Sequence, residues 1–290
     1  MTTAPTLFPG IAAGVNVSTV PQRSPFRYPG GKTWFVPHLR AWLESLPGRP
    51  RLFLEPFAGG GICACTVLVE GLANHVQIVE LDEDVFSVWQ TIFSQDAPLL
   101  AQRLTAFVMD EGTVNGALSQ APTSTLERAV QTILRNRVNR GGILAPGAGR
   151  LKAGENGRGL LSRWYPETLA RRILELYRHR NRVTVIHGDG LAALEKYKDD
   201  SQTASFIDPP YTAGGKRAGS RLYAHWDIDH AELFELTAAQ QGSILMTYND
   251  APEVRLLADA HALNYRSIAM KNTHHAELTE LVIGHDLDWL

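Results

Sequence analysis

The chain has 290 residues, of which 44 % are hydrophobic and 20 % are charged. This composition is typical of a folded globular protein and excludes wholesale disorder, and the length allows one large domain carrying a smaller inserted one. No run of 18 apolar residues occurs, and the first 22 residues contain neither Lys nor Arg, so we expect neither a transmembrane helix nor a signal peptide. Cys63 and Cys65 lie too close together for a disulfide framework, and the sequence predicts a cytoplasmic protein.

The net charge of −2 hides a segregation of charge along the chain. Between Thr123 and Arg182, thirteen basic residues stand against four acidic ones, which gives this window +9 and leaves −11 for the remainder. Like charges repel, so a block this basic favours a polyanionic partner such as a nucleic acid. The alternative is a solvated helical surface that is rich in arginine.

Short apolar runs bounded by Gly, Pro or Asp alternate with helical patterns along the chain. The predicted strands are Arg51–Phe57, Val76–Leu81, Val183–His187, Ala204–Ile207 and Ser243–Thr247, with a closing pair at Tyr265–Met270 and Glu280–His285. The predicted helices are Ile62–Glu70, Glu83–Phe93, Leu191–Tyr197 and His230–Gln240. This alternation predicts an α/β fold with a doubly wound, mainly parallel sheet that binds ligands at the carboxyl ends of its strands.

The basic window interrupts this alternation. Ser124 and Glu127 match a capping box that opens an amphipathic helix, seven glycines follow between Gly141 and Gly159, and a second helix is expected from Pro166 to His179. We therefore expect a loose tail over residues 1–22, a catalytic domain over 23–100 plus 181–290, and a small, mainly helical insert over 101–180.

Two glycine-rich segments are suited to binding a small ligand. Gly59-x-Gly61-x-x-Ala64 opens a helix directly after the first strand, and Glu80 ends the second strand, where a carboxylate can accept hydrogen bonds from ribose hydroxyls. A tight turn without a ligand is the alternative for this segment. Gly30-Gly31-Lys32 resembles a phosphate loop but lacks the required upstream glycine. It suits a carboxylate instead, with Lys32 as the counter-charge and Tyr28 as an aromatic wall.

The tetrapeptide Asp208-Pro209-Pro210-Tyr211 ends the fourth strand. Its prolines hold the Asp208 carboxylate, the Pro209 carbonyl and the Tyr211 ring in one rigid cluster. The carboxylate and the carbonyl can accept the two N–H bonds of an exocyclic amine, and the tyrosine ring can stack on a planar base. The alternative is a turn that merely ends a strand.

Three segments together resemble the Dam-type DNA adenine-N6 methyltransferases of the alpha group. They are Ser24-Pro-Phe-Arg-Tyr-Pro-Gly-Gly-Lys32, Phe53-Leu-Glu-Pro-Phe-Ala-Gly-Gly-Gly61 and Asp208-Pro-Pro-Tyr211, in that order, and the resemblance spans Pro25 to Gly284. It implies a class I (Rossmann-like) methyltransferase fold and S-adenosylmethionine as the methyl donor. The implied cofactor-binding residues are Tyr28, Lys32, Phe57, Gly59, Gly61, Glu80, Asp189 and Asp208, with Asp189 against the adenine ring. Family members often carry Asp at the Glu80 position, so Asp82 is an alternative for the ribose.

The resemblance implies methyl transfer to the exocyclic N6 of an adenine that is flipped out of double-stranded DNA, with Asp208, Pro209 and Tyr211 as the catalytic residues. We expect the basic insert to bind DNA through Arg135, Arg137, Arg140, Arg150, Lys152 and Arg158. The insert resembles the family least, so the target sequence, the oligomeric state and the existence of a restriction enzyme partner stay open.

Other functions compete with this interpretation. The same chemistry on RNA or on cytosine-N4 is the first alternative, since both present an exocyclic amine. A nicotinamide-dependent oxidoreductase would explain the glycine turn and Glu80 but not Asp208–Tyr211 or the basic insert. A non-catalytic DNA-binding module is a third possibility. Cytosine-C5 methylation is excluded because neither cysteine follows a proline, and the histidines lack zinc-ligand spacing, so no metal is expected.

Overall fold

The computed structural model describes residues 17–154, 157–210, 222, 225, 227–271 and 277–290. Within these residues, seven strands form one sheet in the order β3-β2-β1-β4-β5-β7-β6. Strands β1 to β5 run parallel to one another, whereas β7 runs antiparallel to both β5 and β6. The predicted doubly wound, mainly parallel sheet is confirmed, and its order with one reversed strand is that of the class I methyltransferase fold.

The strand bounds agree with the sequence patterns to within a few residues. They are β1 Leu52–Glu55, β2 His75–Glu80, β3 Val183–His187, β4 Thr203–Ile207, β5 Ser243–Asn249, β6 Asn264–Lys271 and β7 Glu277–Gly284. The central strands are buried on both faces, since β1 and β4 have no exposed residue. Strands of this kind produce continuous apolar runs, which explains why their positions are visible in the sequence.

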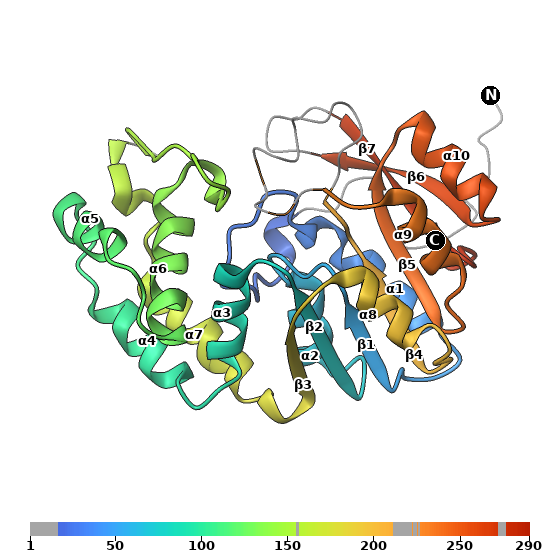
Figure 1. Cartoon of the computed structure of the whole chain (residues 1–290), viewed down its shortest axis with the longest axis horizontal. Coiled ribbons are helices and arrows are strands. Elements are labelled where there is room, and N and C mark those ends of the chain that lie inside the picture. The colour runs from blue at the N-terminus through green and yellow to red at the C-terminus, as the bar shows by residue number, and fades with distance from the viewer. Residues whose placement is uncertain (1–16, 155–156, 211–221, 223–224, 226, 272–276) are drawn as a thin grey trace.

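Helices cover both faces of the sheet (Figure 1). The helices are α1 Val36–Ser45, α2 Ile62–Glu70, α3 Glu83–Ile92, α4 Ala97–Ala106, α5 Glu111–Ser119, α6 Thr125–Val138, α7 Pro166–Tyr177, α8 Gly190–Tyr197, α9 His230–Ala238 and α10 Pro252–Ala260. Side chains of α1, α2 and α3 pack with Phe53 and Phe206 of the sheet in one core cluster. Side chains of α8, α9 and α10 pack with Leu54 and Ile207 in the other, as alternation along a strand requires.

Four of these helices have no counterpart among the predicted elements: α1, α4, α5 and α10. Three of them begin with a proline in the first turn, where its missing N–H costs nothing. Helix α5 contains Gly112 and Gly116 and buries only Val114, so it carries almost no apolar periodicity. Helix α5 therefore gives a weak helical signal in the sequence, whereas the prolines of α1, α4 and α10 are helix-start signals that could have been recognised.

Helices α4 to α7 lie together at one side of the sheet (Figure 1), in the region of the predicted insert. Helix α6 packs against α3, and α7 packs against α4. Ser124 caps α6 by accepting a hydrogen bond from Glu127 N, as the capping box predicts, but the Glu127 carboxylate accepts from Thr123 instead of Ser124. The domain boundaries at residues 101 and 180 stay a prediction. In the described part of the chain, every helix falls short of the length and apolarity that crossing a bilayer requires.

Candidate functional site

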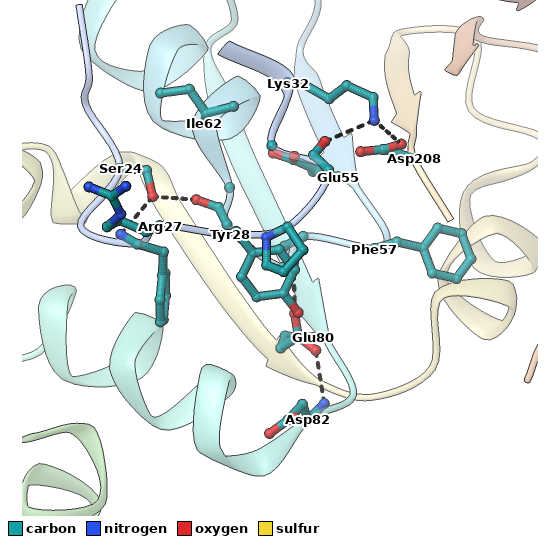
Figure 2. Close-up of a pocket in the computed structure, with 18 of the residues that line it drawn as sticks. Ser24, Arg27, Tyr28, Lys32, Glu55, Phe57, Ile62, Glu80, Asp82 and Asp208 are labelled. Atoms are coloured by element: carbon teal, nitrogen blue, oxygen red, sulfur yellow. Dashed lines mark hydrogen bonds and ion pairs between the residues drawn. The ribbon is translucent and has the colours of Figure 1, made fainter. Parts of the chain in front are cut away.

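A pocket of about 700 Å³ opens at the carboxyl ends of the parallel strands. Four consecutive strand ends each contribute a carboxylate to its lining: Glu55 from β1, Glu80 from β2, Asp189 after β3 and Asp208 after β4. Figure 2 shows Glu55 and Asp208 close to Lys32, and Glu80 farther away with its hydrogen bond from Asp82. This is the location at which open α/β sheets bind their ligands, and the volume suits a small organic molecule.

The glycine turn between β1 and α2 is shaped by two aromatic rings. Gly59 and Gly61 have φ values of 46° and 57°, and both lack the space for a side chain. A Cβ at Gly59 would lie 2.6 Å from the ring of Tyr28, and one at Gly61 would lie 2.6 Å from the ring of Trp89. The turn therefore requires glycine for conformation and for close packing, and Tyr28 lies against it and lines the pocket.

Glu80 lies buried beneath this turn, with 8 % of its surface exposed. Its Oε2 accepts a hydrogen bond from Gly59 N at 2.8 Å, and its Oε1 accepts one from Asp82 N at 2.9 Å. Burial raises the pKa of the Glu80 carboxyl to about 7. Asp82 instead caps helix α3 through hydrogen bonds from Asp84 N and Val85 N. The capping bonds give Asp82 a structural role, whereas Glu80 lies buried at the pocket.

Lys32 is the centre of a buried ion-pair cluster. Its Nζ lies 2.9 Å from Asp208 Oδ1 and 3.6 Å from Glu280 Oε2, and it donates to the Gly30 carbonyl at 3.1 Å. Thr247 Oγ1 donates to the same Asp208 Oδ1 at 2.9 Å. Lys32 is only 3 % exposed, so its ammonium is committed to partners within the chain. The sequence motifs predict Lys32 and Asp208 but give no sign of Thr247 or Glu280, which belong to β5 and β7.

Glu55 is a further buried carboxyl that the sequence analysis did not single out as a site residue. It is 4 % exposed and accepts a hydrogen bond from Ala64 N at 2.6 Å. Burial raises its pKa well above the usual range, and the charges of Asp208 and Glu80 act in the same direction. The sign of Glu55 in the sequence is an acidic residue at the end of an apolar strand.

The remaining predicted ligands of the cofactor also line the pocket. Phe57 and Asp189 lie on its wall, although the described hydrogen bonds of Asp189 go to Leu191 N and Ala192 N, where it caps α8. Pro209 lines the pocket next to Asp208, whereas Tyr211 lies outside the described residues. The pocket therefore brings together the predicted cofactor-binding residues: Tyr28, Lys32, Phe57, Gly59, Gly61, Glu80, Asp189 and Asp208.

The predicted DNA-binding residues divide into two groups. Arg140, Arg150, Lys152 and Arg158 are exposed, as phosphate contacts require. Arg135 is half-buried and forms an ion pair with Asp84, which joins α6 to α3. Arg137 is 5 % exposed, donates to the Pro25 carbonyl and lines the pocket. The position of Arg137 inside the pocket differs from that of the exposed residues with which the sequence grouped it.

The described residues contain no cluster of three or more His, Cys, Asp and Glu side chains arranged to hold a metal ion. Cys63 and Cys65 are fully buried in α2. Burial raises the pKa of both thiols well above the usual range, which fits small core residues and not nucleophiles.

No protein-family model and no curated protein sequence matches the chain. Solved structures that are similar to it include a putative RNA methyltransferase from Pyrococcus horikoshii, with 12 % identity over 89 % of this chain and 84 % of the other and a TM-score of 0.39. A SAM-dependent methyltransferase from Agrobacterium tumefaciens has 9 % identity over 87 % and 61 %, with a TM-score of 0.40. A precorrin 8w decarboxylase from Methanobacterium thermoautotrophicum has 12 % identity over 90 % and 94 %, with a TM-score of 0.35. Likenesses this distant assign neither cofactor nor substrate, so the functional argument rests on the site.

Proposed function

We propose that the chain transfers a methyl group from S-adenosylmethionine to the exocyclic N6 of an adenine in double-stranded DNA. The observation that carries this proposal is the Asp208 carboxylate, which Lys32 and Thr247 hold at the carboxyl edge of the sheet within one pocket with the glycine turn. A nicotinamide-dependent oxidoreductase would leave this cluster and the Asp-Pro-Pro sequence without a role.

The donor set of the pocket fits S-adenosylmethionine. This molecule carries an adenine, a ribose diol and an amino acid group, and its sulfonium and ammonium centres are cationic. Glu80 is placed to accept hydrogen bonds from a ribose diol beside the glycine turn. When bound, the cofactor would supply a methyl group that is activated by its bond to the sulfonium sulfur. Neither a metal nor a covalent enzyme intermediate is then required.

The contribution of Asp208 to this reaction is orientation of the amine. Its carboxylate accepts a hydrogen bond from one N–H group of the exocyclic amine and thereby directs the nitrogen towards the methyl donor. Lys32 and Thr247 fix the position of the carboxylate beforehand, so little reorganisation is needed at the moment of reaction. Pro209 and Pro210 fix their own φ angles directly after Asp208, and the Pro209 carbonyl is the proposed second acceptor.

DNA as the substrate is supported by the exposed basic residues of the insert. Arg140, Arg150, Lys152 and Arg158 offer charges to phosphates. An adenine within a duplex cannot reach a pocket at the edge of a sheet, so the base must leave the stack, at a cost of a few kcal/mol.

The experiment that tests this function measures transfer of label from S-adenosyl-methionine labelled in its methyl group to duplex DNA, to RNA and to no acceptor. We expect transfer to DNA on adenine. Asp208→Asn should lower kcat by about 100- to 1,000-fold, the usual effect of deleting one preorganised polar group. Asp259→Asn, an exposed change at the end of α10, is the matched control and should leave kcat unchanged. Label on RNA alone, or full activity of Asp208→Asn, would contradict the proposal.

A further inference from the structure

The pocket has a second end, formed by helices and the amino-terminal segment, where its charge is reversed. Four arginines line it there: Arg27 before the lysine turn, Arg137 of α6, Arg163 at the end of the short helix Gly159–Arg163, and Arg172 of α7. They lie far apart in the sequence, and only the fold brings them to one pocket. Tyr165, with 49 % of its surface exposed, lines the same end.

Arg137 lies deepest among them. It is 5 % exposed, and its described hydrogen bond goes to the neutral carbonyl of Pro25. Within the described residues, its buried Nε has no hydrogen-bond partner. Burial lowers the pKa of Arg137 to about 9, and the positive charges of the other three arginines act in the same direction. A buried guanidinium among like charges is unfavourable unless an anion compensates for it.

Arg172 resembles Arg137 in its hydrogen bonding but is less buried. It is half-buried, and its described hydrogen bond goes to the carbonyl of Ser24 at 3.0 Å. Burial lowers its pKa, with a further lowering by the charge of Arg171. In the described part of the chain, neither Arg137 nor Arg172 forms an ion pair with a carboxylate. Arg163 is half-buried and Arg27 is exposed, so the guanidiniums lead from the surface to the base of the pocket.

We propose that Arg27, Arg137, Arg163 and Arg172 form a subsite that binds a phosphate group of the substrate strand, next to the nucleotide whose base enters the acidic end. The planar guanidinium matches phosphate oxygens in pairs, which makes arginine the preferred residue for such contacts. This inference rests on the proposed function and extends it, because it assigns the strand backbone to a defined part of the pocket.

A carboxylate is the other oxyanion that could enter, and the cofactor carries one. A phosphodiester and a carboxylate each carry one negative charge, so charge alone does not separate them. The exposed Tyr165 ring beside the arginines favours the phosphate, because an aromatic ring among basic side chains is the usual composition of a surface that binds single-stranded nucleic acid.

The test uses the full chain and two pairs of probes measured by calorimetry. The first pair is 2′-deoxyadenosine 5′-monophosphate and 2′-deoxyadenosine, which differ by the phosphate. The second pair is S-adenosylhomocysteine and 5′-methylthioadenosine, which differ by the amino acid group. The variants are Arg163→Gln/Arg172→Gln, in which glutamine can still donate to the Ser24 carbonyl, and Arg27→Gln at an exposed position. Arg171→Gln, an exposed neighbour on α7, removes the same charge outside the pocket and is the matched control.

We expect the double variant to bind the monophosphate about 10- to 150-fold more weakly, as loss of a charge-assisted contact predicts, and to bind deoxyadenosine and S-adenosylhomocysteine as the wild type does. Arg27→Gln should show a smaller loss for the monophosphate, and Arg171→Gln none. A loss confined to S-adenosylhomocysteine would overturn the proposal, because the arginines would then bind the cofactor's carboxylate. An unchanged preference for the monophosphate in both pocket variants would also overturn it.

The same measurements separate this inference from the proposed function. Arginine-dependent binding of the monophosphate, in a chain that transfers no label to any nucleic acid, would support the subsite and reject the proposed function. Label transfer to DNA with no arginine-dependent binding of the monophosphate would reject the subsite alone. A thermal melt of each variant checks that it is folded.

Discussion

The two ends of the pocket carry opposite charge and balance it in opposite ways. At the sheet edge, the ammonium of Lys32 lies between the carboxylates of Asp208 and Glu280. At the helical end, burial and then the neighbouring arginines lower the pKa of Arg137, and the described bonds of Arg137 and Arg172 go to neutral carbonyls. The sheet edge thus forms a network that is complete within the chain, whereas the helical end gathers charge of one sign. The first arrangement suits the positioning of a reacting group, and the second suits the capture of an anion.

The largest expected effect tests whether the sheet edge is a balanced network. Lys32→Met removes the only cation described between Asp208 and Glu280, and leaves two carboxylates in a largely buried site. Breaking a buried ion pair in this way costs about 3–5 kcal/mol of folding free energy. Chemical denaturation measures this loss. Lys196→Met, an exposed lysine of α8, is the control and should change the free energy of unfolding by about 0.5 kcal/mol or less. A Lys32 variant as stable as its control would show that the network does not depend on the lysine.

The next prediction distinguishes the arginines inside the pocket from the basic residues outside it. Arg150, Lys152 and Arg158 are exposed, so we expect them to contact DNA phosphates without regard to sequence. Replacing all three by glutamine should lower the slope of log affinity against log salt by up to about 2.7, since each phosphate contact contributes about 0.9. Arg49→Gln, just before β1 at the opposite edge of the sheet, should leave the slope unchanged. A triple variant with the wild-type slope would make this loop a solvated surface.

The smallest of these effects concerns pH and sharpens the contrast between the two ends. Glu80 has a pKa of about 7, so its charge changes near neutrality, whereas Arg137, with a pKa of about 9, stays charged there. The ionised carboxylate accepts hydrogen bonds from a ribose diol better than the protonated acid does. At pH 6 only about a tenth of Glu80 is ionised, so the affinity for S-adenosylmethionine should fall by up to about 10-fold between pH 8 and pH 6.

Calorimetry across this range tests the prediction, with Glu80→Gln as the comparison. The glutamine variant keeps any pH dependence that comes from the cofactor's own amino group and should lose the part that comes from Glu80. Identical pH profiles in the two proteins would show that Glu80 does not bind the cofactor as an ionised carboxylate.

The sheet end of the pocket is largely predictable from the sequence because its parts are local. The Gly59–Gly61 turn and the Asp208-Pro-Pro sequence each follow directly from a strand, so the position of each can be read without knowing the fold. The partners of Lys32 could not be predicted in this way. Glu280 lies on β7, which the reversed strand order places beside β5, and only the assembled sheet brings it to the lysine.

For the helical end of the pocket, the sequence predicted only an excess of positive charge. The +9 window indicates a polyanion, but it includes exposed, paired and buried arginines without distinction. Arg135 is paired with Asp84, Arg137 is buried and Arg140 is exposed, although the three lie within six residues. Their different environments come from the packing of α6 on α3 and on the amino-terminal segment. Arg27 lies outside the window altogether, so no count of charge could have placed it in the pocket.

The measurement that tests the central claim most directly is the mapping of methylated bases in DNA from cells that express this chain. The account predicts N6-methyladenine at a defined DNA sequence with the wild-type chain and its absence with Asp208→Asn produced at the same level. Methylation of cytosine instead of adenine, or DNA without any methylated adenine while the wild-type chain is present and folded, would contradict it.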